Sequence, residues 1–425
     1  MCTCSSIKSI KAQGLIYTIE NNIMYVTRPL SLYRSDQCSA SASASVLVEG
    51  PNTGVLVIED EGSERRWFFG LVKDESVEEP PFPQNKLLEL RYKKTAARQR
   101  HRRHPYTDYF YVMLIPVLNQ PPNSNQYYVI DSRGKSKGLA CTSSKEDDMI
   151  SCCCFNLIDD IKPQLFDPTN PYQQFQINSK YSFFQSSSNG FISNSMAPDG
   201  VPPYFLRHQG WTAETRNLDQ KFDAAPALGI DAALRARLPE LDCTAVDPVV
   251  VGKWYCPFIF IREGDVGVQM RDSTYYEMTL QQNWEEIFGC YNNNDRGHRV
   301  TVDVCVRSEA VLVGEALLAA EGVVVSDGIM WFSPSSTWEV GLSMAIVERV
   351  KWEEERVGFV WGRNDHEEQI EIRTVRREEF EGKGTIWRRF RCYVLVEKFV
   401  LKRMNGTLVL TWEFRHTHQI RTKWE

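Results

Sequence analysis

The sequence predicts a mostly β fold, a β-rich α+β chain of two β-sandwich-like lobes with a short covering helix. Three observations lead to this prediction. Short runs rich in β-branched and aromatic residues recur from residue 54 onward, residues typical of turns separate them, and one short segment carries clear helix signals. The order of the strands cannot be derived from the sequence.

The N-terminal lobe is expected to span residues 24–184, after a disordered extension at residues 1–23. Within it, VIE at 57–59 and VID at 129–131 each precede a similar Phe-containing segment, which suggests an internal duplication. The strand-like runs of this lobe are 54–61, 65–72, 86–92, 108–118, 126–131 and 150–158.

A linker is predicted at residues 185–203, which are rich in Ser, Asn, Gly and Pro. The C-terminal lobe, 204–425, then begins with a helix near 231–238 that Asp231 can cap and Pro239 would end. The strand-like runs that follow are 249–261, 274–280, 300–306, 322–332 and 340–352. In the last run, apolar residues recur at alternate positions, which favours a strand, and the mixed-charge run 351–356 is expected to be solvated.

The last two strands are predicted to form a hairpin. Asn405-Gly406 is typical of a type I′ turn, in which both central residues have positive φ. Placing the turn there sets every later pair of residues across the hairpin. The predicted pairs are Leu401 with Leu410, Phe399 with Trp412, Lys398 with Glu413, and Leu395 with His416.

The composition excludes some classes of protein. The 425 residues carry a net charge of −6, whereas a general nucleic-acid-binding protein carries a basic excess. No apolar run reaches the roughly 18 residues of a membrane-spanning helix, and residues 1–23 lack the apolar core of a secretory signal. We therefore expect a soluble intracellular protein, cytoplasmic or nuclear, whose twelve cysteines stay reduced.

Two histidines on the last predicted strand are candidate metal ligands. His416 and His418 are two residues apart and would share one face of a strand, and Glu397 would lie diagonal to His416 across the hairpin. Two histidines and one carboxylate form a common metal-binding set. The alternative is that the histidines end the apolar face and hold no metal, and no cofactor is expected.

A basic run between two predicted strands is the candidate anion-binding segment. It could bind phosphate, anionic lipid or nucleic acid locally, or act as a nuclear address, and the simpler interpretation is a solvated hairpin loop. Its cationic residues are Lys93, Lys94, Arg98, Arg100, Arg102 and Arg103.

Several uncommon strings occur in order along the chain. They include MYVTRPLSLYR (24–34), GPNTGVLVIEDE (50–61), PFPQNKLLELRY (81–92), GKWYCPFIFI (252–261) and FVLKRMNGTLVLTWEFRHTHQIRTKWE (399–425). In these strings the chain resembles a plant protein family known as domain of unknown function 1262. The resemblance implies a plant protein and no activity, because the family has no established catalytic residues.

The sequence contains no catalytic motif, so no catalytic residue is assigned and enzymatic activity is not expected. Together with the resemblance, this favours a non-catalytic plant binding or interaction protein in stress or defence, with an unknown protein or an anionic ligand as its partner. One alternative is a membrane-active, pore-forming-like β protein that contacts the membrane surface. Another is a metal-dependent enzyme that uses Glu397, His416 and His418.

Overall fold

Most of the chain can be described in atomic detail. The computed structural model describes residues 24–35, 50–67, 72–94, 106–145, 147, 149–152, 155–181, 188–220, 226–241, 247–292, 298–318, 322–335, 338–361, 371–381 and 386–425. The predicted extension at 1–23 lies outside these residues. Strands dominate the described residues, so the mostly β prediction is confirmed.

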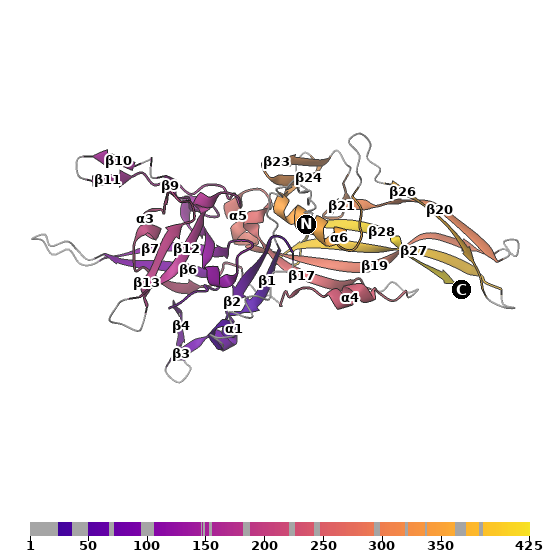
Figure 1. The fold of residues 1–425 in the computed structure, drawn as a ribbon, viewed down its shortest axis with the longest axis horizontal. Coiled ribbons are helices and arrows are strands. Elements are labelled where there is room, and N and C mark those ends of the chain that lie inside the picture. Colours follow the sequence, from indigo (N-terminus) through magenta and orange to yellow (C-terminus); the bar gives the residue numbers. More distant parts are fainter. Residues whose placement is uncertain are drawn as a thin grey trace, which may run out of the picture.

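A seven-stranded sheet forms one end of the elongated molecule (Figure 1). Its order is β13-β12-β8-β7-β6-β15-β5, and its strands have the Val, Ile, Tyr and Phe content that favours a pleated, half-buried surface. The strands are β5 (Ser76–Val77), β6 (Leu87–Lys94), β7 (Tyr106–Pro116), β8 (Gln126–Asp131), β12 (Gln174–Tyr181), β13 (Ser188–Ser195) and β15 (Thr212–Arg216).

A nine-stranded sheet runs through the rest of the molecule, and its longest strands reach the opposite end (Figure 1). The order is β2-β1-β17-β19-β27-β28-β21-β22, with β16 beside β17. The strands are β1 (Met24–Pro29), β2 (Thr53–Ile58), β16 (Gly229–Ile230), β17 (Val249–Pro257), β19 (Tyr275–Tyr291), β21 (Glu309–Val313), β22 (Ala316–Leu317), β27 (Arg389–Arg403) and β28 (Leu408–Trp424).

Smaller sheets and helices complete the fold. One four-stranded sheet has the order β18-β25-β24-β23, built from Ile261–Arg262, Trp338–Ser343, Ile329–Ser335 and Val323–Ser326. The strand pairs are β3–β4 (Arg65–Trp67, Val72–Asp74), β9–β14 (Ser144–Lys145, Gly200–Val201), β10–β11 (Met149–Cys152, Phe155–Ile158) and β20–β26 (Arg299–Arg307, Glu371–Glu379).

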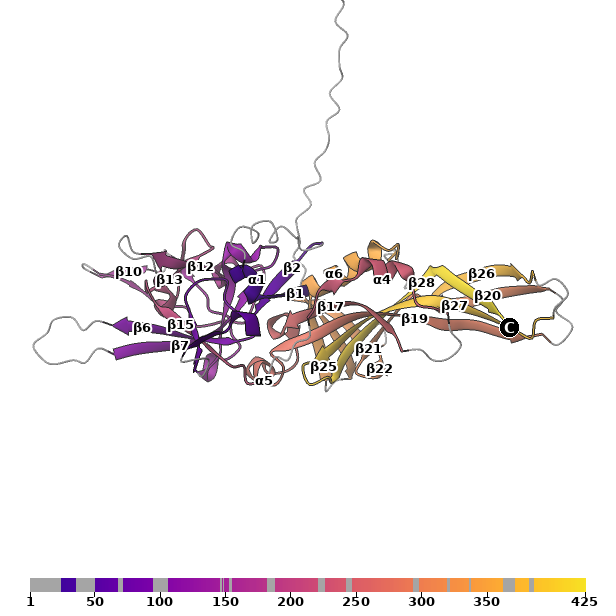
Figure 2. The ribbon, with the colours of Figure 1, turned by 90° about the horizontal axis from the view of Figure 1, so that it is seen from below.

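The helices are short. They are α1 (Leu30–Ser35), α3 (Tyr204–Arg207), α4 (Ala232–Arg237), α5 (Val266–Asp272) and α6 (Met344–Glu355), with 3₁₀ turns at Glu61–Ser63, Pro122–Ser124, Gly134–Ser136, Pro171–Gln173 and Phe258–Phe260. Figure 2 shows α4 and α6 on the same side of the long strands. Among the described helices, none has the length and apolar character needed to cross a membrane.

The largest hydrophobic core joins the two large sheets. Met113 and Tyr128 of the seven-stranded sheet pack in one cluster with Trp254, Met278 and Phe399 of the nine-stranded sheet. Two buried hydroxyl groups reinforce this contact, because Tyr25 donates to the carbonyl of Pro116 at 2.8 Å and Tyr275 donates to the carbonyl of Gln84 at 2.6 Å. The two sheets are therefore tied together by both packing and hydrogen bonds.

The N-terminal part of the chain contributes strands to both large sheets. β1 pairs with β17, and β2 pairs in parallel with β1, so residues 24–58 contribute two strands to the sheet formed mainly by the C-terminal half.

The two runs of the suggested duplication lie in different sheets. VIE at 57–59 overlaps β2, and VID at 129–131 ends β8 in the other large sheet.

The segment predicted as a linker contains a strand. Within residues 185–203, β13 pairs antiparallel with β12, with Phe191 opposite Ser179 and Ile192 opposite Asn178. Its Ser and Asn residues are typical of loops, but the strand lies at the edge of the sheet, where a polar side chain can face water at little cost. The composition therefore led to a wrong prediction at these positions.

The hairpin prediction is confirmed in register and wrong in turn type. The four predicted pairs are all present across β27 and β28. The N–H of Gly406 donates to the carbonyl of Arg403 at 2.8 Å, so Met404 and Asn405 are the central residues, and Gly406 alone takes the positive φ, 83°. A bulge between Leu401 and Lys402 restores the predicted register.

The run 340–352, predicted as one strand, is divided between β25 and α6. Ser343 is the last residue of β25, and α6 begins at Met344. Ala, Met, Glu, Lys and Arg are strong helix formers, which favours a helix over 344–355 despite its valines. Buried residues occur on several sides of α6, so the sequence lacks the single apolar stripe by which an amphipathic helix is recognised.

Candidate functional site

The first wall of the candidate site is the helix α4. The side chain of Asp231 accepts a hydrogen bond from the backbone N–H of Leu234 at 2.8 Å, which caps the helix as predicted. Pro239 follows the helix, in agreement with its predicted end. One turn beyond the cap, Arg235 points into the protein and is buried. The helix therefore places a cation beside the long strands.

The second wall is the last turn of α6, which carries two consecutive glutamates, Glu353 and Glu354. Both are fully buried, at 0% exposure, so the prediction that the run 351–356 is solvated was wrong for them. A carboxyl group buried in a protein interior either pairs with a positive charge or takes up a proton and becomes neutral. The position of α6 against the sheet makes such partners available from α4 and β28.

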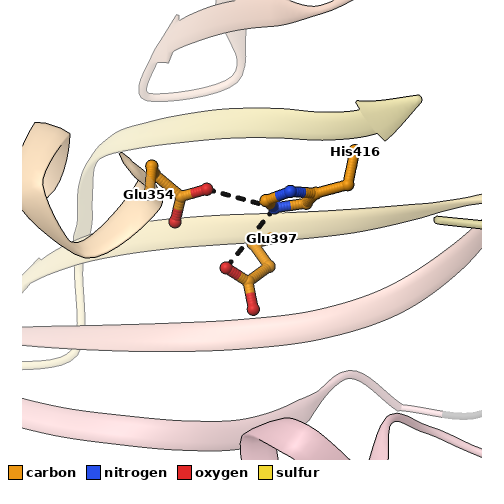
Figure 3. A group of neighbouring side chains, drawn as sticks. All are labelled: Glu354, Glu397 and His416. Atoms are coloured by element: carbon orange, nitrogen blue, oxygen red, sulfur yellow. Dashed lines mark ion pairs between the residues drawn. The ribbon is translucent and has the colours of Figure 1, made fainter. Parts of the chain in front are cut away.

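The third wall is formed by the long strands. Glu397 on β27 lies opposite Gln282 on β19, and His416 on β28 lies opposite Leu395 on β27. Because alternate residues of a strand share a face, Glu397 and His416 are diagonal neighbours, as predicted. Glu397 is 1% exposed and His416 is 2% exposed. Figure 3 shows both side chains converging with Glu354.

These side chains form one buried ionic network. Arg235 donates through Nε to Oε1 of Glu397 at 2.9 Å and also bonds the second oxygen of that carboxylate. It donates to Glu353 at 3.1 Å and to Glu354 at 3.3 Å. Nε2 of His416 lies 3.1 Å from Oε2 of Glu354 and 3.4 Å from Oε2 of Glu397, as ion pairs. One arginine therefore joins three carboxylates from two elements, α6 and β27.

Two further arginines complete the network through Glu353. Arg349, one turn earlier on α6, bonds Oε1 of Glu353, and Arg356 contacts Oε2 through its Nε at 2.8 Å. We call these seven residues the buried ionic network. They are Arg235, Arg349, Glu353, Glu354, Arg356, Glu397 and His416.

Burial favours the neutral forms of these side chains, whereas oppositely charged neighbours favour their ionised forms. Burial raises the pKa of Glu354 to about 8. Burial also acts against the ionised form of Glu397, but contacts with His416 and Arg235 outweigh it and hold the pKa of Glu397 well below its usual range. Burial favours a neutral imidazole, yet Glu354 and Glu397 raise the pKa of His416 to about 9. His416 is therefore a cation at neutral pH.

The network has the residue types of a metal site, but Arg235 already supplies the positive charge that a metal ion would bring. One ligand atom from each of Glu354, Glu397 and His416 lies within 4.8 Å of the others. However, both oxygens of Glu397 and one of Glu354 already accept hydrogen bonds from Arg235. A divalent ion would have to displace a guanidinium that occupies the same side of these carboxylates. The residues therefore do not fit a metal ion.

The predicted ligand His418 lies outside this group. It is exposed, and its ring is perpendicular to that of His416 with the centroids 5.4 Å apart. The reason is a bulge, because Leu395 pairs with His416 while the preceding Val394 pairs with Ile420. The three extra residues of β28 break the alternation that the prediction assumed. Sequence reasoning also missed Arg235, Glu354 and Gln282.

A cavity of about 510 Å³ lies beside the network, and we call it the network cavity. This volume is within the roughly 300–1,000 Å³ that small-molecule sites typically have. Its polar lining comes from Arg235, Gln282, Arg356, Glu397, His416 and Gln419, and its apolar lining from Ala232, Ala236, Leu238, Val357 and Leu395. The cavity thus combines an apolar body with a few convergent polar groups.

Gln282, which lines the cavity, keeps one buried side-chain atom without a hydrogen-bond partner among the described residues. Its side-chain N–H₂ donates to Oε1 of Glu397 at 2.7 Å and to the backbone carbonyl of Arg235 at 3.2 Å. Since both neighbours are acceptors, the amide cannot be turned over, and its Oε1 stays buried without a hydrogen bond among the described residues. A buried carbonyl without a donor is costly, and because this oxygen is closed off from solvent and from the cavity, that cost is internal to the network.

The basic run is described only at its start. Lys93 is exposed on β6, whereas Lys94 contacts Asp108 at 2.5 Å and donates to the hydroxyl of Tyr204 at 2.6 Å. Lys94 is therefore neutralised within the fold. The remaining predicted anion-binding residues, Arg98, Arg100, Arg102 and Arg103, lie outside the described residues.

Comparisons with known proteins agree with the resemblance seen in the sequence. Residues 49–155 match the family described as "Protein of unknown function (DUF1262)", which confirms the resemblance over that segment. No curated protein matches the chain. Among solved structures, the chain is similar to the one titled "Crystal structure of Cry35Ab1", with a TM-score of 0.44 and 14% identity over 81% of this chain and 90% of that chain.

Proposed function

We propose that this chain is a non-catalytic binding protein that holds a small ligand in the network cavity. The observation that carries the proposal is the network cavity itself, which is large enough for a small molecule and combines an apolar body with a few convergent polar side chains. Nothing in this proposal requires a cofactor, because Arg235 supplies the positive charge that the carboxylates of the network need.

The proposal assigns no chemistry to the network. Every carboxylate of the network is paired with an arginine. Two of these carboxylates, Glu354 and Glu397, stabilise the protonated form of His416. A general base needs a free lone pair near neutral pH, and an imidazole with a pKa of about 9 is protonated there. The network instead provides a rigid wall of fixed charges, as suits a binding site.

Blocking the cavity from α4 will test the proposal. Ala236 is exposed on the surface of α4 and lines the cavity, so Ala236→Trp should fill its mouth without disturbing the core. We expect a small molecule to copurify with the native protein and to be lost, by roughly tenfold or more, in this variant. Mass spectrometry of the denatured extract measures it.

The matched control is Ala233→Trp, which adds the same bulk to an exposed position of α4 outside the cavity lining. This variant should retain the small molecule. Equal loss from both variants, or equal retention in both, would remove the cavity as the binding site. Conversion of the recovered molecule into a product by the native protein would contradict the non-catalytic part of the proposal.

The biological setting is also part of the proposal. The resemblance implies a plant protein, and we propose an intracellular role in stress or defence, in the cytoplasm or nucleus. The sequence motivates this setting through the family strings. Partner proteins would then respond to the liganded state, since binding that orders a protein changes its affinity for a second partner.

A second candidate function is membrane-surface contact, favoured by a tyrosine cluster at the end of β6 and β7. Tyr106, Tyr109 and Tyr204 are 56%, 54% and 47% exposed. Nζ of Lys94 lies 5.2 Å from the ring centroid of Tyr106 and 4.9 Å from that of Tyr204. Exposed tyrosines are typical of protein surfaces that lie at the membrane–water interface.

Vesicle flotation will test this candidate. We expect the Tyr106→Ser/Tyr109→Ser variant to bind vesicles rich in phosphatidylserine roughly tenfold more weakly than the native chain, because it removes two interfacial rings. Tyr291→Ser, at an exposed position at the end of β19, is the control. Dye release from the same vesicles separates membrane-active behaviour from simple docking. Identical binding by all three proteins would reject the candidate.

A further inference from the structure

We infer that α4 is a lid over the floor of the network cavity, and that Arg235 holds this lid closed. As a route for a ligand, the lid rests on the proposed function, but its motion needs no ligand and is measured without one. Three observations carry the inference: the burial of the cavity floor, the contacts that hold α4, and the backbone conformation of Leu238.

The floor of the network cavity is closed off in this conformation. It is formed by Leu395, Glu397 and His416, which line the cavity from β27 and β28 yet are only 3%, 1% and 2% exposed. Ala232 and Ala236, which line the same cavity from α4, are exposed. A ligand can therefore enter the mouth of the cavity beside α4, but it cannot contact the floor unless a wall moves.

Of the three walls, α4 is the one with little apolar anchorage. The long strands are joined by continuous pairing, and α6 buries Ile346, Val347 and Val350 completely in the core. The three alanines of α4 are exposed, and Leu234 is only partly buried against the core. A helix of six residues is not stable by itself, so its contacts with the rest of the protein decide whether it stays in place.

Polar contacts, most of them made by Arg235, hold α4 against the strands. The guanidinium bonds three glutamates of the buried ionic network, and the backbone carbonyl of Arg235 accepts a hydrogen bond from Gln282 at 3.2 Å. Just beyond the helix, the indole N–H of Trp284 donates to the carbonyl of Pro239 at 2.9 Å. The start of α4 is tied down separately by the pairing of β16 with β17. The helix can therefore swing out from its C-terminal end once these contacts break.

The departure of Arg235 leaves no carboxylate of the network without a cation. Each of the three glutamates has a second positive partner that does not belong to α4, so the main cost of breaking a buried ion pair is avoided. These pairs are Glu353 with Arg356 at 2.8 Å, Glu354 with His416 at 3.1 Å, and Glu397 with His416 at 3.4 Å. The part of the network on α6 and the strands therefore stays in place while the guanidinium moves into water.

The backbone of Leu238, directly after α4, is strained in the closed position. Its φ is 58° and its ψ is 152°, a combination that is essentially restricted to glycine. A residue stays in such a conformation only where the surrounding structure imposes it. Here the contacts of Arg235 and Pro239, one on each side of Leu238, impose it. The strain is released when α4 swings out, so it favours opening and opposes the hold of Arg235.

Alkylation of a thiol placed in the cavity floor measures the opening. Leu395→Cys puts this thiol on β27, and the native Cys392, fully buried on the opposite face of the same strand, is the internal control. The full chain is treated with iodoacetamide at neutral pH, and mass spectrometry follows both sites. We expect the floor thiol to react roughly tenfold or more faster than Cys392, because local opening is easier than global unfolding. Arg235→Gln should accelerate the floor thiol roughly tenfold more than it accelerates Cys392, because it removes charge-assisted hydrogen bonds.

A matched pair of variants at Leu238 keeps the test valid if Arg235→Gln unfolds. Leu238→Gly and Leu238→Ala, each combined with Leu395→Cys, both remove the leucine side chain. Only glycine adopts the closed backbone conformation without strain, so only Leu238→Gly stabilises the closed lid. The floor thiol should react roughly fivefold more slowly in Leu238→Gly than in Leu238→Ala. Equal rates in the two variants would contradict the release of strain on opening and overturn the inference.

The outcomes distinguish the lid from the proposed function. If the floor thiol reacts no faster than Cys392, only global unfolding exposes the floor, and the lid is overturned. If it reacts as fast as in the denatured chain, the floor is open without any motion, and the lid is overturned too. In both cases a small molecule that copurifies with the native protein still supports binding in the cavity. Lid motion in a chain from which no small molecule copurifies would support the lid and reject the proposed function.

Discussion

Replacing Glu397 by Gln will lower the free energy of unfolding by about 3–5 kcal/mol, the typical cost of leaving a buried ion without its partner. Glu397 accepts hydrogen bonds from Arg235 through both oxygens and from Gln282 through one, and it also contacts His416. Glutamine has nearly the same shape, but its N–H₂ would face donors, and the charge of Arg235 would lose its closest counter-ion. Urea denaturation followed by tryptophan fluorescence measures the change.

A surface pair serves as the control for this prediction. Asp303 and Arg373 pair on β20 and β26, where both side chains are largely exposed to solvent, so Asp303→Asn should change the unfolding free energy little. In an Arg235→Gln background, Glu397→Gln should cost much less than it does alone, because the partner has already been removed. If Glu397→Gln in the otherwise native chain lowers the unfolding free energy no more than Asp303→Asn does, the network is not paired as described.

The second large effect is the loss of stability in mild alkali. His416 has a pKa of about 9 in the folded chain against an ordinary 6.5, and Glu354 has a pKa of about 8 against an ordinary 4.5. Both groups are raised, so each contributes stability that is complete below its ordinary pKa and is lost as the pH rises through its folded pKa. The unfolding free energy should fall from about pH 4.5 to 8 through Glu354 and from about pH 6.5 to 9 through His416. The fall is steepest between about pH 6.5 and 8, where both groups contribute, with a slope of at most about 1.4 kcal/mol per pH unit for each proton.

The acid side has the opposite sign. The pKa of Glu397 is depressed in the folded chain, so its contribution is present above the ordinary value of 4.5 and is lost as the pH falls below it. Urea titrations across pH 5 to 9 test the alkaline part. His416→Gln should remove one of the two protons and so about halve the slope between pH 6.5 and 8, whereas His418→Gln should leave it nearly unchanged, since His418 is exposed. An unchanged slope in His416→Gln would contradict the assignment.

The sequence predicted those parts of the site that depend on local pairing. The hairpin register of β27 and β28 follows from a turn signal and an apolar alternation, and it correctly placed Glu397 beside His416. The cap of α4 was equally local, because Asp231 and Pro239 mark the two ends of the helix. Both predictions depend only on residues that are close together in the chain or on the pairing of two adjacent strands.

The sequence could not predict the parts that depend on distant packing. Glu354 belongs to a run of charged residues, which on its own is typical of a solvated surface, and its burial depends on where α6 meets the sheet. Arg235 lies in a correctly predicted helix, yet its three partners are 118 to 162 residues away in the chain. His418 was assigned to the site because a bulge carries no strong signal in a single sequence.

The pairing of β1 with β17 has a consequence for how the chain reaches this structure during synthesis. The backbone of Thr27 bonds to that of Ala227, 200 residues later, and Tyr25 lies opposite Tyr255. β1 therefore leaves the ribosome long before β17 is made, and its edge toward β17 must remain unpaired until the middle of the chain emerges, even if β1 and β2 have already paired with each other. Folding should be slow and completed late, and a chaperone that shields this early segment would raise the yield of native protein.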